Sequence, residues 1–130
     1  MTSTASLPFG PITTNHPNPD ATADEWVSWF WEVFFPAWIE RARDPEAIGF
    51  YDLLDGDGRP AQVNRRTILA QARLLFTFSH LALLSDQPVF HEAAAIAREA
   101  IDAFRKASGL YCRGRTATGE ATDDPADLLA

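Results

Sequence analysis

The chain has 130 residues, a formal net charge of −7 and 46% hydrophobic residues. This length and composition suit one folded domain with one core and exclude a disordered chain. The acidic balance argues against nucleic acid and anionic membranes as partners, because both would repel the chain. The sequence contains no run of 18 apolar residues, so no membrane-spanning helix is predicted. The single cysteine, Cys112, excludes an intrachain disulfide and indicates a reducing, cytoplasmic compartment.

The first predicted element is an N-terminal arm over residues 1–21, which is rich in Pro, Thr, Ser and Asn. We expect this arm to be disordered. It has neither the basic nor the apolar region of a signal peptide. A single folded domain is then predicted over residues 22–130.

A helix is predicted over residues 23–42. Thr22 and Glu25 have the spacing of a capping box directly before an apolar run. Pro36 lies inside this run and predicts a kink or a break, because proline cannot donate the helical hydrogen bond. The run holds the four tryptophans Trp26, Trp29, Trp31 and Trp38. Their aromatic rings indicate core packing, with the lining of a sugar-binding cavity as the alternative.

Two β-hairpins are predicted between helices. The sequence DGDG lies between two short extended runs and predicts a hairpin over residues 49–63. A calcium loop is disfavoured there, because the acidic ligand ladder and closing glutamate of an EF-hand are missing. The triplet Gly49-Phe50-Tyr51 recurs sixty residues later as Gly109-Leu110-Tyr111, which predicts a second hairpin over residues 110–121.

A helix that is apolar on two sides is predicted over residues 65–85. At 100° per residue, one side gathers Ile68, Leu69, Ala72, Leu75, Phe76 and Leu83, and the opposite side gathers Leu74, Phe78 and Leu81. Such a helix is covered on both sides. A third edge carries Arg66, Arg73 and His80 at every seventh residue.

An amphipathic surface helix is predicted over residues 88–107. The order helix, hairpin, helix therefore occurs twice. Asp124 and Pro125 suit the N-cap and first position of a further helix, where the repeat requires a second buried helix. We expect that the chain stops inside this element, which leaves one apolar side of helix 65–85 uncovered.

The stretch RRTILAQARLLFTFSHLALL, residues 65–84, resembles the first inner helix of the N-acylglucosamine 2-epimerase family, which includes mannose isomerases and cellobiose 2-epimerases. The matching residues include Arg65, Arg66, Gln71, Ala72, Arg73, Phe78 and Ser79. The segments FFPAWIE and GFYDLLDGDGRP are similar to two further motifs of this family. Phe76 departs from the family pattern, which often has tyrosine. The resemblance covers about residues 24–130.

The resemblance implies an all-α fold, a partial (α/α)6 barrel with short β-hairpins between helices. It implies an isomerase that moves a proton next to the carbonyl of a sugar through an enediol-like intermediate, without a metal or cofactor. Two histidines of the family act as general base and acid. They belong to later repeats, and His16, His80 and His91 do not match them. We therefore expect that this chain, with about two of six repeats, is inactive alone and self-associates or forms a homodimer.

Three substrate-binding residues follow from the resemblance. Arg73 matches the inner-helix arginine that holds substrate oxygens near the reacting carbonyl, and its alternative role is a pair with a buried carboxylate. Tyr51 and Tyr111 lie in the hairpins that approach the sugar, with packing as their alternative role.

Two other functions stay open. Another (α/α)6 carbohydrate-active enzyme, such as a glycosidase, would need two facing carboxylates, which the buried helix does not offer. A non-enzymatic helical module would instead bury its apolar faces against a partner. The sequence leaves open which sugar is used and whether it is epimerised or isomerised.

Overall fold

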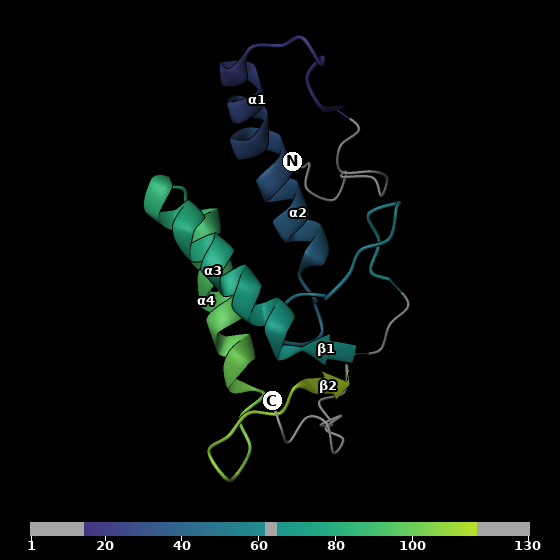
Figure 1. Cartoon of the computed structure of the whole chain (residues 1–130), viewed down its shortest axis with the longest axis vertical. Helices are drawn as coiled ribbons and strands as arrows, with labels where there is room; N and C mark the ends of the chain where they lie inside the picture. The colour runs from purple at the N-terminus through teal and green to yellow at the C-terminus, as the bar shows by residue number, and fades with distance from the viewer. Residues whose placement is uncertain (1–14, 62–64, 117–130) are drawn as a thin grey trace. The chain divides into compact units, whose positions relative to one another are not determined.

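The computed structural model describes residues 15–61 and 65–116 (Figure 1). These residues divide into two compact units, one of residues 15–42 with 53–61 and one of residues 43–52 with 65–116. The predicted arm over residues 1–21 lies largely outside the described part. Within that part, the ring of His16 stacks on Trp26 with centroids 5.8 Å apart.

The first unit contains one continuous helical stretch built from α1 (Ala23–Trp29), η3 (Phe30–Phe34) and α2 (Phe35–Ala42). The predicted capping box is present, because Glu25 N donates to Thr22 Oγ1 at 3.2 Å and Thr22 N donates to Glu25 Oε2 at 2.7 Å. These bonds satisfy donors that the first helical turn would otherwise leave free.

The break expected at Pro36 takes the form of a wider turn directly before it. Segment η3 is a π-helix, and Phe35 N donates to Phe30 O. A proline ring clashes with the carbonyl four residues earlier, and a π turn changes the local register so that the helix can continue. The predicted helix over residues 23–42 is thus present with this local change.

Aromatic rings pack against one another along the helical stretch. Trp29 is buried, and its ring lies 5.0 Å from Phe30 and 5.4 Å from Phe34. Trp26 approaches Trp29 edge-on at 5.9 Å. These contacts support core packing as the role of Trp29.

The predicted first hairpin is a short turn over Leu53–Ala61, closed by a single antiparallel bridge between Leu54 and Pro60. Asp55 Oδ1 accepts hydrogen bonds from Asp57 N at 2.8 Å and Arg59 N at 3.1 Å. Gly58 has φ of 77°, which favours glycine. The Asp55 carboxylate therefore holds the turn itself, as aspartate does in Asx turns.

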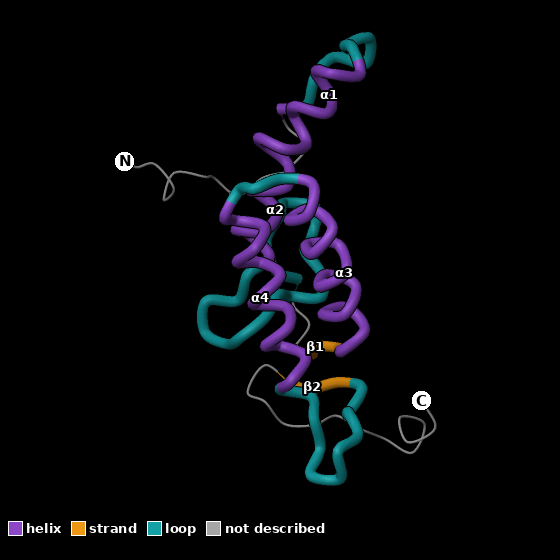
Figure 2. Tube along the Cα trace, turned by 90° about the vertical axis from the view of Figure 1, so that its left-hand side faces the viewer, coloured by secondary structure: helices purple, strands orange, loops and turns teal. Residues whose placement is uncertain are grey.

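The second unit contains β1 (Arg65–Thr67), α3 (Ile68–Leu84), α4 (Pro88–Asp102) and β2 (Gly114–Thr116). Helices α3 and α4 run antiparallel side by side, and the two strands lie together at the start of α3 (Figure 2). Phe78 and Leu81 of α3 are buried, as are Phe90, Ala93, Ala97 and Ala100 of α4. The stripe of alanines lets the two helices approach closely, and burial of this apolar surface stabilises the pair.

The two strands pair segments that are about fifty residues apart in the sequence. Strand β1 pairs antiparallel with β2, in the register Arg65 to Thr116, Arg66 to Arg115 and Thr67 to Gly114. Residues 65–67 are therefore a strand and not the first turn of the helix. The second turn is closed by a bridge between Arg105 and Tyr111, and α4 ends at Asp102, five residues before the predicted end. The second hairpin was predicted over residues 110–121, but Gly114–Thr116 within it pairs with β1. Residues 117–121 of that prediction lie outside the described residues.

Candidate functional site

Loop Arg43–Asp52 is attached to α3 through the buried amide of Gln71. Gln71 Nε2 donates to Phe50 O at 2.7 Å, and Gln71 Oε1 accepts from Phe50 N at 3.1 Å. Phe50 is completely buried, and its ring lies 5.1 Å from that of Phe78. Gln71 thus satisfies both backbone groups of Phe50 within the core, which explains a glutamine on the buried side of this helix.

Gly49 allows this loop to approach the helices. Its φ is 114°, and an added Cβ would lie 2.9 Å from Ala100 Cβ and 3.0 Å from Gln71 Oε1. Both the backbone conformation and the space therefore require glycine.

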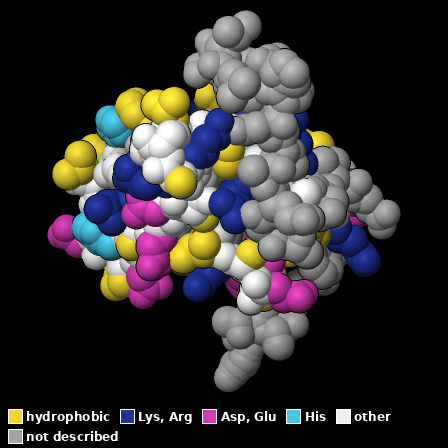
Figure 3. Space-filling model, turned by 90° about the horizontal axis from the view of Figure 1, so that it is seen from below, with side chains coloured by type: hydrophobic (Ala, Val, Ile, Leu, Met, Phe, Trp, Pro, Cys, Tyr) yellow, Lys and Arg dark blue, Asp and Glu magenta, His cyan; other side chains and the backbone are white. Residues whose placement is uncertain are grey.

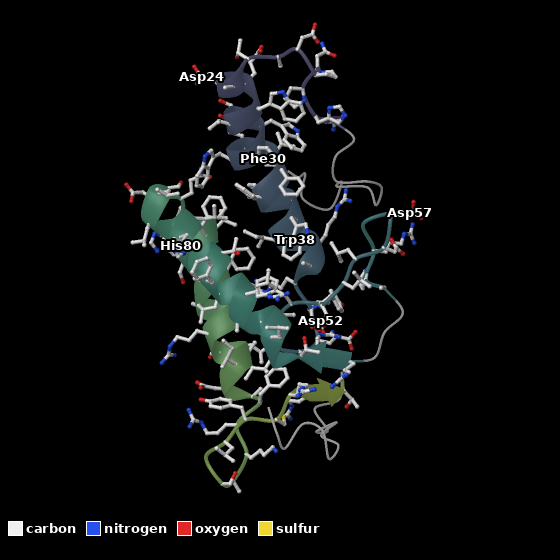
Figure 4. The ribbon with its side chains drawn as sticks, viewed as in Figure 1. Asp24, Phe30, Trp38, Asp52, Asp57 and His80 are labelled. Carbon is white, nitrogen blue, oxygen red and sulfur yellow. The ribbon has the colours of Figure 1, made fainter. Side chains whose placement is uncertain are left out.

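Asp52 fixes the start of α3, where it is labelled in Figure 4. Its carboxylate accepts hydrogen bonds from Thr67 N at 3.1 Å and from Thr67 Oγ1 at 2.6 Å. Thr67 Oγ1 in turn accepts from Ala70 N at 3.3 Å and caps the helix. This capping ends the strand at Thr67 and starts the helix at Ile68.

Tyr51 belongs to a largely buried cluster with Asp44 and Arg66. The Arg66 guanidinium forms an ion pair with Asp44, with 14% and 8% of their side-chain surfaces exposed, and lies 4.5 Å from the centre of the Tyr51 ring. Tyr51 Oη donates a long hydrogen bond of 3.5 Å to Asp44 Oδ1. Burial, and then the Asp44 carboxylate, raises the pKa of Tyr51 above its usual value of 10.0. Tyr51 is therefore a neutral donor at physiological pH.

Arg73 lies on the side of α3 opposite to the buried Gln71, among exposed apolar residues. The exposed fractions are 54% for Leu69, 67% for Phe76, 82% for Leu83 and 76% for Leu84. Arg73 makes no hydrogen bond or ion pair with any residue in the described part of the chain. We call this surface, Leu69, Ala72, Arg73, Phe76, Thr77, His80, Leu83 and Leu84, the open face of α3. These apolar side chains are exposed within the described part of the chain, and the expectation that one apolar side of this helix is uncovered stays a prediction.

His80, labelled in Figure 4, is engaged within the same helix. Its Nδ1 lies 2.8 Å from the Phe76 carbonyl oxygen, to which it donates in the Nδ1-protonated form, and the two rings are 4.2 Å apart. This supports a helix-surface role for His80.

Tyr111 lies after α4 and is 40% exposed, with the Arg105 guanidinium 5.0 Å from its ring centre. Within the described residues, no hydrogen bond or ring contact joins Arg73 to Tyr51 or Tyr111. The three predicted site residues are therefore not in contact. The sequence analysis missed Asp44, Asp52 and the structural role of Gln71, although a glutamine inside an apolar helix is a signal that could have drawn attention to it.

The described part of the chain consists of helices joined by short extended segments, and one of these helices, α3, is apolar on two sides. The chain is similar in structure to cellobiose 2-epimerase from Spirochaeta thermophila DSM 6192, with a TM-score of 0.66 and 24% sequence identity. This likeness covers 77% of this chain and 25% of the epimerase chain, so the chain spans a quarter of that protein's length. It confirms the partial barrel fold and agrees with the resemblance to the N-acylglucosamine 2-epimerase family. No protein-family model and no curated protein matches the sequence.

Two further findings bear on the class of protein. None of the helices in residues 15–61 and 65–116 is long and apolar enough to cross a membrane. The same residues hold no cluster of three or more His, Cys, Asp or Glu side chains arranged to bind a metal ion. Cys112 is buried, and its backbone N–H donates to Phe104 O at 2.7 Å, which supports a packing role for this residue.

Proposed function

We propose that this chain is a segment of a sugar epimerase or isomerase and that it contributes an arginine that binds the substrate. The enzyme would move a proton next to a carbonyl through an enediol-like intermediate. The fold likeness to a cellobiose 2-epimerase supports the class of enzyme. The observation that carries the proposal is Arg73, an arginine without a carboxylate partner among the described residues on the open face of α3.

The chemistry of such a site suits a guanidinium. A planar fork of N–H donors binds two oxygens at once, and a fixed cation stabilises the negative charge that develops on an enediolate. A carboxylate partner would compete for the same donors. The absence of such a partner in residues 15–61 and 65–116 favours the role in substrate binding over the structural pair.

We propose that the general base and acid of this reaction are not provided by His16, His80 or His91, because none of the three matches the two histidines of the family that the sequence resembles. His80 is bonded to Phe76 O, and His16 stacks on Trp26. We therefore propose that the chain binds sugar without turning it over, and that turnover requires additional parts of a barrel.

The residues of α3 also allow a comparison with two rival functions, a glycosidase and a non-enzymatic helical module. A glycosidase would need carboxylates facing the substrate, and α3 contains neither Asp nor Glu. A non-enzymatic helical module is favoured by one observation, the large exposed fractions of Phe76 and Leu83. Such a module would bind no sugar at Arg73, which makes sugar binding the discriminating experiment.

The experiment is an NMR titration of the 130-residue chain with cellobiose, mannose and N-acetylmannosamine, followed through the Nε–Hε signal of Arg73. We expect this signal to shift with a Kd on the order of 10 mM, because one charge-assisted contact contributes about 1.5–3 kcal/mol. Arg73→Met should abolish binding, and Arg98→Met, at an exposed arginine of α4, should not. Equal binding by both variants, or no shift with any of the sugars, would show that Arg73 does not bind sugar.

A further inference from the structure

The placement of Arg73 depends on the first turn of α3. Arg73 lies six residues after the N-cap Thr67, at the start of the second helical turn. A long side chain on a helix points back toward the N-terminus and covers the preceding turn. Helix ends fray unless their free N–H groups are capped. The position of the Arg73 guanidinium therefore depends on what holds the first turn.

Loop Arg43–Asp52 binds this first turn at both of its ends. Asp52 accepts hydrogen bonds from Thr67 N at 3.1 Å and Thr67 Oγ1 at 2.6 Å, and Phe50 exchanges two backbone hydrogen bonds with the Gln71 side chain. An extended segment rises about 3.3 Å per residue, so Phe50 and Asp52 span about 6.6 Å, and the four residues from Thr67 to Gln71 span about 6 Å along a helix axis. The two attachments match in spacing and can form together.

The loop is itself fixed, so Asp52 does not simply follow the helix. Arg43 and Phe50 form an antiparallel bridge across the base of the loop. The carboxylate of Asp44 forms an ion pair with Arg66 of β1. The loop therefore presents Asp52 to α3 as an acceptor whose position is set independently of the helix.

The hydroxyl of Thr67 has a single hydrogen-bonding direction. A carboxylate only accepts hydrogen bonds, so the hydroxyl donates its proton to Asp52, and it accepts from Ala70 N at 3.3 Å. Hydrogen bonds in such a chain polarise and strengthen one another. The negative charge of Asp52 also interacts favourably with the N-terminal end of the helix dipole. Loss of this carboxylate would thus loosen the first turn of α3.

We propose that Asp52 is a positioning residue for sugar binding by Arg73. It acts through Thr67, which fixes the first turn of α3, and it does not touch the sugar itself. A side chain that is already held in place loses less conformational entropy when it binds a ligand. The inference rests on the proposed function, since it assigns Asp52 a part in the same sugar site.

This role of Asp52 is geometric and does not depend on its charge at long range. Cellobiose, mannose and N-acetylmannosamine are neutral, so a distant carboxylate changes their binding little. On the face shown in Figure 3, basic and acidic side chains lie among one another, and charges beyond about 8–10 Å are screened at physiological salt. Asp57→Asn is the matched control, because it removes the same charge from an exposed position in the turn Leu53–Ala61.

The test is an NMR titration of the full 130-residue chain and its variants with these three sugars, followed through the Nε–Hε signal of Arg73. Asp52→Asn and Thr67→Val should each raise the Kd about 3-fold or more, because the loosened turn loses part of a charge-assisted contact. Asp57→Asn and Thr67→Ser, which keeps the capping hydroxyl, should keep the Kd of the parent. Sugar binding by the parent that Asp52→Asn leaves unchanged would overturn the role of Asp52 alone. Absence of binding in the parent would overturn the proposed function as well.

Hydrogen exchange of the sugar-free chain separates positioning from a general loss of stability. In Asp52→Asn, the protection of the backbone amides of Ala72 and Arg73 should fall at least about 3-fold more than that of Leu81 and Ala82, the buried residues near the other end of α3. The reason is that local opening exposes only the first turns of the helix. Loss of protection by the same factor at all four amides would show a global effect and overturn the proposal.

Discussion

At the scale of single residues, two arginines of the inner-helix motif, Arg66 and Arg73, have different surroundings. Arg66 is largely buried and paired with Asp44, whereas Arg73 is exposed and makes no ion pair with a described residue. One motif thus contains a buried, ion-paired arginine and, seven residues later, an exposed arginine without an ion pair among the described residues. This difference could not be predicted from the sequence, because the spacing of seven residues places both on the same helical edge, while Arg66 actually belongs to a strand.

Stability measurements should separate the two roles. Arg66→Met breaks a buried ion pair and should lower the free energy of unfolding by about 3–5 kcal/mol. Arg73→Met should change it by about 0.5 kcal/mol or less, as expected for a surface position without a partner. Urea unfolding of both variants checks this. A loss of several kcal/mol in Arg73→Met would instead reveal a structural partner for Arg73.

Tyr51 makes stability depend on alkaline pH. Its pKa is raised in the folded state, so the fold favours the protonated phenol. The contribution is fully present below pH 10.0, the usual pKa, and is lost as pH rises through the higher folded value. We expect the free energy of unfolding to fall less between pH 9 and pH 11 (about one unit on either side of the usual pKa) in Tyr51→Phe than in the unmodified chain. Parallel pH profiles in urea melts would contradict this role of Tyr51.

At the scale of elements, the helices were predictable from local signals and the loop attachments were not. The capping box at Thr22 and the two apolar sides of helix 65–85 predicted helices that the structure contains. The side with Phe78 packs in the core, and the side with Phe76 is the open face. The start of α3 was displaced by three residues because Thr67 caps the helix, and Asp52, fifteen residues before Thr67, holds that residue from a loop. Helical periodicity contains no information on such a distant partner.

The attachment of the loop to α3 depends on Gln71. Gln71→Leu keeps a similar volume but leaves the buried N–H and C=O of Phe50 without partners. Each unsatisfied buried group costs about 1–3 kcal/mol, so we expect the free energy of unfolding to fall by about 2–6 kcal/mol in thermal or urea unfolding. As a control, Gln87→Leu changes the same residue type at an exposed site and should have little effect. Equal melting of the Gln71 variant and the parent would refute this role.

The open face of α3 predicts self-association. Four large apolar residues there are each more than half exposed, and such a contiguous surface is commonly an interaction site. Phe76→Glu should raise the monomer fraction in sedimentation velocity. Ala95→Glu introduces the same charge on the exposed side of α4 and should not. A parent chain that stays monomeric at all concentrations would remove this prediction.

At the scale of the whole molecule, the fold is that of part of a barrel, and the sequence motifs predicted this class. The likeness spans a quarter of cellobiose 2-epimerase from Spirochaeta thermophila. Helix periodicity predicted the architecture, because it indicates which faces of the helices are buried. The repeated triplet did not predict burial, since Phe50 is completely buried and Leu110 is exposed. The proposed substrate site would combine side chains from several repeats, so the residues of this chain predict one proposed substrate-binding arginine, Arg73, and not the other groups of such a site.

The most direct test measures deuterium incorporation at C2 of cellobiose, mannose and N-acetylmannosamine in D₂O. The chain is assayed alone and after assembly with a Spirochaeta thermophila epimerase that lacks its matching quarter. We expect no exchange by the chain alone, exchange by the assembly, and a rate about 10²-fold lower with Arg73→Lys, by analogy with removal of one donor to a developing oxyanion. Exchange by the isolated chain, or an assembly whose rate is the same with Arg73→Lys, would contradict the account.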